Sequence, residues 1–412
     1  MKNVIVVGGG ASGIFAAVKA REMGARVTLM EKNNRLGKKM LITGKGRCNI
    51  TNAGTLDDFI ANIPGNGPFL YSAFSLLSNQ DTMDFFHRLG VPTKVERGDR
   101  VFPVSDRSAD VVEALKTYLQ KIGVSCKYHL TVESLAISQG VMKGVDTAHG
   151  FFSADAVIVA TGGASYPGTG STGDGYQMAR QAGHTIVPLK PSLVPLETVE
   201  PWVKELQGLT LKNVKVTAWA DGKILSSEFG EMLFTHFGVS GPVILSLSKV
   251  ITASLDQHPR SPVQVIIDLK PALSFEQLDQ RLQRDFQKYS RKYLANSFTD
   301  LLPKSLIPVF VQLLPISGDK FVHQITKEER GQIIKGLKEF TVTIKKPRPL
   351  AEAIVTSGGV SVKEINPKTM ESKRVKGLFF AGEVLDIDGF TGGYNLQAAF
   401  STGFAAGKAA AE

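Results

Sequence analysis

The sequence predicts an α/β protein in which a parallel sheet and a β-meander are interrupted by a large inserted lobe of strands and helices. A strand at Asn3–Val7, a glycine turn, a helix from about Ala11 and a strand at Arg26–Glu31 make a βαβ unit. The continuous apolar run Ala156–Ala160 is typical of a buried parallel strand. A strand at Gly377–Ala381 then leads through a glycine-rich turn into a final helix. We therefore expect one sheet that draws strands from both ends of the chain.

Length and composition favour a soluble globular protein of two or three lobes. The chain has 412 residues, of which 43% are hydrophobic and 21% charged, which excludes disordered and fibrous proteins. The longest uncharged apolar stretch near the start, Val4–Val18, is shorter than the ~20 residues that a membrane helix needs. Cleaving it as a secretory signal would remove the glycine turn, so we expect a cytoplasmic protein. Two cysteines, Cys48 and Cys126, are too few for a disulfide framework or a thiolate metal site.

The segments between the βαβ unit and the apolar strand predict one helix and a meander. Apolar residues recur at helical spacing from Val111 to Ile122, with Ser105 or Asp106 as the N-cap and Gly123 beyond the end. Alternating runs that indicate meander strands follow at Lys127–Ile137, Val141–Thr147 and Gly150–Ser153.

Proline-rich stretches at residues 187–195 and 345–349 indicate where the chain passes between lobes. We assign residues 1–189 and 350–412 to one nucleotide-binding domain and 190–349 to the insert, strand-rich over 190–270 and helical over 271–340. The elements expected in the insert are strands at Val214–Ala220, Leu225–Ser227 and Val263–Leu269 and helices at Phe275–Phe286, Leu306–Leu313 and Lys327–Phe340.

The glycine turn carries the clearest chemical signal. Gly8, Gly10 and Gly13 form GxGxxG between a strand and a helix, where glycines permit a tight turn, close approach of a pyrophosphate and close helix–strand packing. The N–H groups at the helix start then meet the anion. Glu31, at the end of the next strand, is placed to accept hydrogen bonds from ribose hydroxyls. These features predict a dinucleotide-binding site.

Further motifs resemble a known family. VIVATGG, with Thr161 and Gly162 after the buried strand, and the closing segment FFAGEVLDIDGFTGGYNLQAAFSTG resemble the two-dinucleotide-binding-domain flavoproteins. LGKKMLITGKGRCNITN, TGSTGDGY and GEMLFTHFGVSGPVILSLS resemble more narrowly the BaiN-type, or HI0933-like, family of FAD-dependent oxidoreductases, over essentially the whole chain. The resemblance implies a Rossmann-like domain that binds FAD.

The resemblance also implies roles for individual residues. The residues implied to contact FAD are, in chain order, Gly8, Gly10, Ala11, Ser12, Gly13, Glu31, Lys32, Lys38, Lys39, Gly46, Arg47, Cys48, Asn49, Val132, Thr161, Gly162, Gly382, Glu383, Gly393, Asn395 and Leu396. Within this set the glycine loop holds the pyrophosphate, Val132 lies by the adenine and Glu383 meets the ribityl chain. Gly393, Asn395 and Leu396 form a helix start under the pyrimidine edge of the flavin. A positive helix end there stabilises the negative charge of reduced flavin.

Two residues are candidate proton donors, each with a structural alternative. Cys48 lies in the loop expected near the ring, yet most single buried cysteines only pack. His236 lies in the distinctive FTHFGVSGP turn, where a structural role is the alternative. No spacing typical of a metal site appears.

Three functions stay open. The resemblance implies reduction of an activated C=C bond, either in uridine of ribosomal RNA or in an enone-type small molecule such as a bile-acid intermediate; an RNA-binding assembly factor with structural FAD is the third. The net charge of +10, and the cluster of basic residues from Arg281 to Lys304 in a helical stretch, favour RNA. A separate nicotinamide-binding glycine motif is absent, so NAD(P)H would reach the flavin transiently or another donor would serve.

Overall fold

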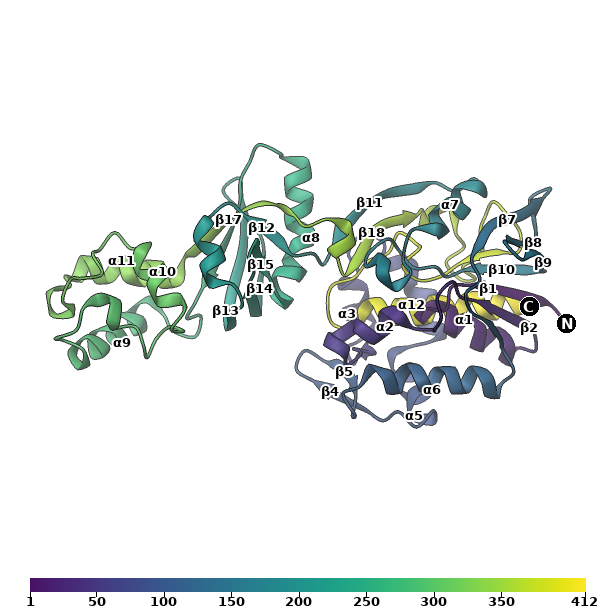
Figure 1. Cartoon of the computed structure of the whole chain (residues 1–412), viewed down its shortest axis with the longest axis horizontal. Coiled ribbons are helices and arrows are strands. Elements are labelled where there is room, and N and C mark those ends of the chain that lie inside the picture. Colours follow the sequence, from purple (N-terminus) through teal and green to yellow (C-terminus); the bar gives the residue numbers. More distant parts are fainter. The chain divides into compact units, whose positions relative to one another are not determined.

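The computed structural model describes all 412 residues and divides into two compact units (Figure 1). Unit 1 contains Met1–Ser192 and Leu350–Glu412, and unit 2 contains Leu193–Pro349. The sequence placed the two boundaries at 189/190 and 349/350. No helix in either unit is both long and apolar enough to cross a membrane.

The centre of unit 1 is a five-stranded parallel sheet, which confirms the predicted α/β class. Its order is β19-β10-β1-β2-β6, and the strands are β1 (Asn3–Val7), β2 (Arg26–Met30), β6 (Ser125–Lys127), β10 (Ala156–Val159) and β19 (Leu378–Phe380). Val4 pairs with both Ala156 and Val27, so β1 lies between β10 and β2. Strands buried on both faces are continuous apolar runs, and β10 is buried along its whole length.

The predicted run Lys127–Ile137 is not one meander strand. Ser125–Lys127 pairs in parallel with β2 as the edge of the main sheet, and the meander begins at Val132. It consists of β7 (Val132–Ser138), β8 (Val141–Thr147) and β9 (Gly150–Ser153). The sequence alternation is the same for an edge strand and a meander strand, so it could not separate the two.

Two long helices of unit 1 lie side by side: α1 (Ala11–Glu22) and α12 (Tyr394–Ala411). A Cβ at Gly403 would lie 2.2 Å from the Ser12 carbonyl oxygen, and a Cβ at Gly407 would lie 2.2 Å from that of Ala16. Because both contacts advance in the same chain direction, the two helices run parallel. Phe15 of α1 also stacks on Phe400 of α12 with ring centroids 4.3 Å apart.

The remaining elements of unit 1 surround this sheet. Helix α6 (Ser108–Lys121) follows the predicted periodicity, but its N-cap is Arg107, since Ser105 and Asp106 lie in the preceding turn. The other helices are α2 (Lys38–Ile42), α3 (Leu56–Ala61), α4 (Tyr71–Leu76), α5 (Asn79–Arg88) and α7 (Asp174–Gln181). The other strands are β3 (Thr51–Asn52), β4 (Thr93–Glu96), β5 (Arg100–Pro103), β11 (Ile186–Ser192) and β18 (Val355–Val360).

Unit 2 combines a closed barrel with a helical part. The barrel order is β12-β15-β14-β13-β16-β17, formed by β12 (Leu196–Thr198), β13 (Thr210–Ala220), β14 (Lys223–Phe234), β15 (Gly238–Ser240), β16 (Val263–Asp268) and β17 (Phe340–Pro347). The helices are α8 (Pro242–Gln257), α9 (Phe275–Lys288), α10 (Leu306–Gln312) and α11 (Lys327–Lys338).

Three expectations for unit 2 are corrected. The short strand expected at Leu225–Ser227 extends over Lys223–Phe234, because both flanks pair with β13 and β15. Phe340 belongs to β17 rather than to the preceding helix. The basic stretch from Arg281 to Lys304 is not one helix, since α9 ends at Lys288.

The contact between α1 and α12 gives a stability prediction. Gly407→Ala should lower the melting temperature of the protein, because the new Cβ meets helix backbone that cannot give way. Gly331→Ala is the matched control, since a Cβ there meets nothing within 4 Å and alanine favours an exposed helix by up to about 1 kcal/mol. Thermal unfolding of both variants checks this, and equal melting temperatures would contradict the close packing.

Candidate functional site

The candidate site lies where the parallel strands of unit 1 end. Gly8–Gly10 follow β1, Glu31 follows β2, Thr161 follows β10 and Gly382 follows β19. The chain adds β2 on one side of β1 and β10 on the other, so the glycine loop lies at the point where strand order reverses. Ligands of open parallel sheets bind outside the carboxyl ends of the strands at such a point.

The three glycines of the loop have different surroundings. A Cβ at Gly8, whose φ is 103°, would lie 2.5 Å from the Ala160 carbonyl oxygen, and a Cβ at Gly13 would lie 1.8 Å from the Gly8 carbonyl oxygen. These two glycines let loop, strand and helix touch. A Cβ at Gly10 meets nothing within 4 Å. Gly10 therefore opens a space at the start of α1, beside Ala11 and Ser12, where unpaired helix N–H groups attract an anion.

Glu31 is buried and holds the glycine loop. Its Oε2 accepts a hydrogen bond from Gly9 N at 2.8 Å, and its Oε1 accepts one from Asn33 N at 2.7 Å. Lys38 Nζ in turn donates to Asn33 Oδ1 at 3.0 Å. Leu130 N donates to the Glu31 carbonyl oxygen at 3.1 Å, so the chain that leads to Val132 lies beside this carboxylate. The predicted ribose and adenine residues are thus neighbours.

A second carboxylate, Glu383, lies at the end of β19. Lys39 Nζ is 2.8 Å from its Oε2 and also donates to Ser165 Oγ at 2.7 Å. Glu383 Oε1 accepts from Thr356 N at 2.8 Å. Next to it, a Cβ at Gly382 would lie 2.4 Å from Ser12 Oγ, so the end of β19 touches the start of α1. Lys39 and Glu383 therefore form one charged pair that connects two of the predicted cofactor segments.

The N-terminus of α12 lies further along the same edge. Its N-cap Gly393 has φ 103°, and a Cβ there would lie 2.3 Å from the Thr51 backbone. In the amide orientation that satisfies its neighbours, Asn49 Oδ1 accepts from Gly393 N at 2.9 Å. Asn395 closes the preceding turn, accepting from Gly389 N at 2.8 Å, and Leu396 packs against the core. The segment from Asn49 to Thr51 is held against the start of α12 by the Asn49 side chain and by close backbone contact at Thr51.

The N-termini of the parallel helices α1 and α12 are offset along the helix axes. Ser12 lies opposite Gly403, while α1 begins at Ala11 and α12 begins at Tyr394. Helix α12 therefore extends about eight residues further, or roughly 12 Å at 1.5 Å per residue. The positive ends of α1 and α12 therefore point in the same direction and are offset by this distance. This arrangement suits a pyrophosphate at the start of α1 and a charged ring edge at the start of α12. The residues present fit FAD.

Other predicted residues have partners on the surface of unit 1. Lys32 pairs with Asp174 Oδ2 at 2.5 Å. Arg47 binds Glu96 and Asp106 and lies 4.0 Å above the Phe102 ring, and its hydrogen bond to Glu96 is the largest of the effects that raise its pKa. Both cations are thus paired with carboxylates that lie outside the glycine loop.

Three backbone positions and one histidine complete the predicted set. Gly46 and Gly162 have φ of 85° and 74°, values that glycine adopts without strain. The Thr161 hydroxyl is buried without a hydrogen-bond partner and lies against α7, where a Cβ at Gly175 would be 2.2 Å from it. His236 belongs to unit 2, where it is exposed and in edge contact with Phe237.

Cys48 is fully buried and has a φ of 62°, rare for a side chain other than glycine. Burial raises the pKa of its thiol to about 12, against a smaller opposing effect of the hydrogen bond with Thr43. At neutral pH the group is therefore a protonated thiol, which can donate a proton but is no nucleophile. Cys126, the other free cysteine, lies on β6 and also has a raised pKa because of burial.

Sequence reasoning missed a buried polar cluster under the start of α12. Gln397 Oε1 accepts from Thr51 Oγ1 at 2.7 Å, and its Nε2 donates to Thr82 Oγ1 at 2.9 Å and to Leu77 O at 3.1 Å. Ser165 and Thr356, the partners of Glu383, were missed as well. No local pattern marks these residues, since each is defined by contacts far along the chain.

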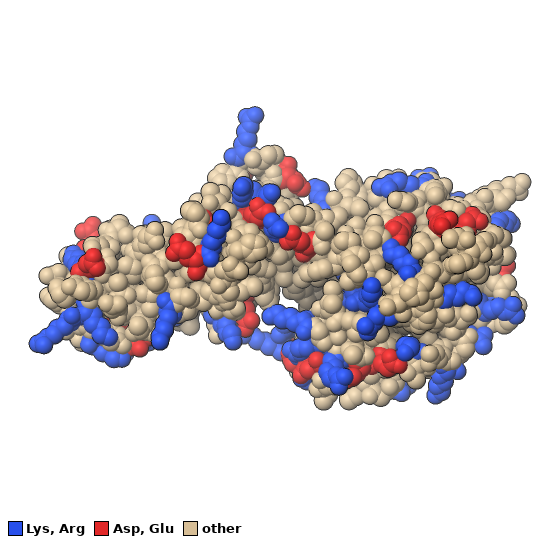
Figure 2. Space-filling view, viewed as in Figure 1, with Lys and Arg blue, Asp and Glu red and all other residues tan.

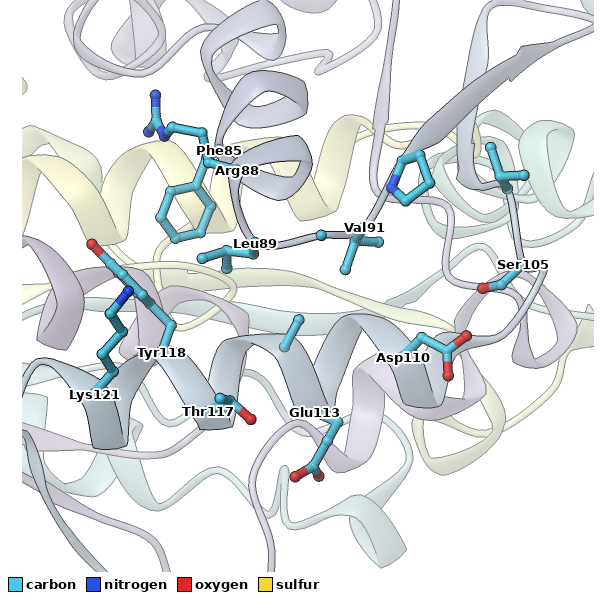
Figure 3. A pocket seen from close by; sticks show the side chains of 14 residues that line it. Phe85, Arg88, Leu89, Val91, Ser105, Asp110, Glu113, Thr117, Tyr118 and Lys121 are labelled. Carbon is cyan, nitrogen blue, oxygen red and sulfur yellow. The ribbon is translucent and has the colours of Figure 1, made fainter.

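A large surface groove of unit 1 is separate from this site. It has a volume of about 890 Å³ and lies between the end of α5 and one face of α6, with Phe85, Leu89 and Tyr118 along its floor (Figure 3). None of the predicted cofactor residues line it. No group of three or more His, Cys, Asp or Glu side chains capable of holding a metal ion occurs in the chain.

The sheet, the glycine loop with its carboxylate and the second helix end define an FAD-dependent oxidoreductase of the Rossmann-type flavoprotein class. Residues 2–409 match the HI0933-like protein Rossmann domain family, and the chain belongs to that family.

Relatives span the full length. The chain is 34% identical to the 3-dehydro-bile acid delta(4,6)-reductase of Clostridium scindens, covering 100% of both chains. It is 32% identical to the ribosomal RNA dihydrouridine synthase of Haemophilus influenzae, covering 97% of this chain and 96% of that protein. The 3-ketosteroid delta1-dehydrogenase of Sterolibacterium denitrificans has the same fold, with a TM-score of 0.54, 13% identity and 100% coverage of both chains.

The different surroundings of Gly10 and Gly13 predict different effects for alanine substitutions at these two positions. Gly10→Ala should leave the melting temperature of the FAD-free protein unchanged but raise the FAD dissociation constant at least about tenfold, because its Cβ enters only ligand space. Gly13→Ala should lower the melting temperature as well, because its Cβ meets the Gly8 carbonyl. Flavin fluorescence titration and thermal unfolding check this. A Gly10→Ala protein that binds FAD like the parent would refute the assignment of the loop.

The buried thiol gives a pH prediction. A folded-state pKa of about 12 contributes stability that is complete below the ordinary thiol pKa and is lost as the pH rises towards 12. Between about pH 8 and about pH 10.5 the free energy of unfolding should fall on the order of 2 kcal/mol more for the parent than for Cys48→Ala. Denaturant unfolding at both pH values measures this. Parallel pH profiles would show that Cys48 is not buried as described.

Proposed function

We propose that the protein is an FAD-dependent reductase of an activated carbon–carbon double bond, with uridine in ribosomal RNA as the favoured substrate. The observation that carries the redox function is the pair of helix N-termini at one sheet edge, α1 for the pyrophosphate and α12 for the flavin. A second helix end of this kind is superfluous for mere nucleotide binding. It stabilises a ring that gains negative charge on reduction.

FAD held at this site would supply, in its reduced form, the hydride for one carbon of the double bond, and the other carbon would need a proton. Glu31 accepts a hydrogen bond from the glycine loop and holds it in place, and the Lys39–Glu383 pair connects the end of β19 to α2. Cys48 and His236 are our candidates for the proton donor. Cys48 holds its proton at neutral pH because its pKa is raised by burial. NAD(P)H is the proposed source of electrons.

The substrate choice rests on charge and on the relatives. Two relatives of similar identity are named as a bile-acid reductase and as a ribosomal RNA dihydrouridine synthase, so identity does not separate the alternatives. The chain carries a net charge of +10, which favours a polyanionic substrate. A bile-acid-like enone, with a single carboxylate, gains less from such a charge than a polyanion does. An enone-type small molecule is the second candidate, and an RNA-binding assembly factor with structural FAD is the third.

Ribosomal RNA from a deletion strain tests the favoured function. We expect mass spectrometry to find one uridine that lacks the two-hydrogen mass increment present in the parent strain. Reintroducing Gly10→Ala should restore the increment only partly, whereas Gly331→Ala, far from the loop in sequence, should restore it fully. Unchanged RNA together with NAD(P)H-dependent reduction of an enone by the purified protein would establish the second candidate. Absence of turnover on both substrates would favour the third.

A further inference from the structure

The helical part of unit 2 contains an exposed row of aromatic rings. The turn after α9 and the segment before α11 pair through an antiparallel bridge between Tyr293 and Phe321. Leu294 N donates to Lys320 O at 2.9 Å, and Val322 N donates to Lys292 O at 3.0 Å. These bonds flank the bridge, so Tyr293 and Phe321 form the pair type whose side chains approach most closely.

The rings of Tyr293, Phe321 and His323 follow one another in this row. The Tyr293 and Phe321 ring centroids are 4.6 Å apart with planes 30° from parallel, and those of Phe321 and His323 are 5.6 Å apart at 26°. Tyr293 is 44% exposed and His323 is exposed, while Phe321 between them is half-buried. His323 is fixed to the turn, since its Nδ1 is 2.8 Å from Ser290 O. The three rings therefore form a short row in which the central ring, Phe321, is half-buried and the two end rings are exposed.

Exposed cations accompany the row. Arg291 and Lys292 directly precede Tyr293 and are exposed, and Lys292 Nζ lies 4.3 Å from the Tyr289 ring. Figure 2 shows Lys and Arg side chains along the lower left edge of the molecule, where Figure 1 places α9.

Part of the basic cluster expected from the sequence is already neutralised. Arg281 pairs with Asp285 at 2.9 Å, and Lys288 pairs with Asp300 at 2.7 Å. The same contacts occupy the acids Asp285 and Asp300. Arg284 and Lys304 lie outside these two pairs as well, and Arg291 and Lys292 are the cations of the cluster that lie directly beside the rings.

We propose that the row Tyr293–Phe321–His323, with Arg291 and Lys292, is a platform that binds unpaired bases of RNA. A base continues the stack at an exposed end of the row, while the cations neutralise the adjoining phosphates. Double-stranded RNA offers no free base face, so the platform selects single-stranded loops or bulges. This inference deepens the proposed function and rests on it.

Substitutions of the exposed ring test the platform. Tyr293→Ala should weaken binding of a ribosomal RNA fragment that contains an unpaired loop about tenfold, whereas Tyr293→Trp should retain it, because any aromatic face can stack. Phe275→Ala is the matched control, since Phe275 is 49% exposed on α9 but outside the row. Fluorescence anisotropy at several salt concentrations measures binding, and the flavin absorbance of each variant shows that the FAD domain is intact.

A charge substitution tests the phosphate contact separately. Arg291→Ala should lower the log–log slope of affinity against salt by about 0.7, the value for one phosphate on a single strand. Lys335→Ala, a highly exposed lysine on α11, removes the same charge and should leave the slope unchanged.

The results of these experiments distinguish failure of the platform from failure of the proposed RNA substrate. If the parent binds and modifies RNA but Tyr293→Ala does so equally well, the platform is refuted and the proposed function stands. If the parent shows no salt-dependent RNA binding, both the platform and the RNA substrate fail. If Tyr293→Ala loses RNA binding and Tyr293→Trp retains it, the platform is established.

Discussion

The structure of unit 1 depends on how closely two helix backbones approach each other. Gly403 and Gly407 of α12 allow contact with the Ser12 and Ala16 carbonyls of α1, and Gly13 in turn allows α1 to touch the glycine loop. At these glycines no side chain separates the backbones, so the loop, the first helix and the last helix are closely packed against one another. Because α1 follows β1 and α12 follows β19 of the same parallel sheet, both helix dipoles point the same way, and this packing holds the two helices together. Because these glycines have no side chains, the glycine loop and the two helix ends can take the positions that the candidate site requires.

Basic residues near the same sheet edge are paired with carboxylates and do not form a continuous positive surface. Residues 31–47, which follow the second strand, contain six Lys or Arg residues. In the structure Lys32, Lys39 and Arg47 each have a carboxylate partner. The attraction for an anion therefore comes mainly from helix N–H groups, which are fixed in place and need no flexible side chain to order.

The sequence predicted the parts of the fold and site that are encoded locally. The GxGxxG turn, the glutamate after β2, the helix periodicity of α6 and the glycine before α12 are short patterns with one physical meaning each. Features fixed by distant contacts were not predictable. The edge position of Ser125–Lys127 requires β2 as a partner, the barrel of unit 2 requires β12 to pair with β17, and the role of Gln397 requires Thr51 and Thr82. Helix α8 (Pro242–Gln257) was not predicted.

The position of α12 in the chain has a consequence for biosynthesis. Strand β19 and helix α12 follow the whole of unit 2, so the β1–α1 unit is synthesised before unit 2 and receives these two neighbours only after unit 2 has been synthesised. Until then the face of α1 that carries Ser12 and Ala16 is uncovered, and Gly382 and Gly393 are not yet in place. Domains generally fold in the order in which they leave the ribosome. Here the inserted unit can fold before the domain whose two segments flank it in the chain, and the segments of the candidate flavin site are all present only after the inserted unit has been synthesised.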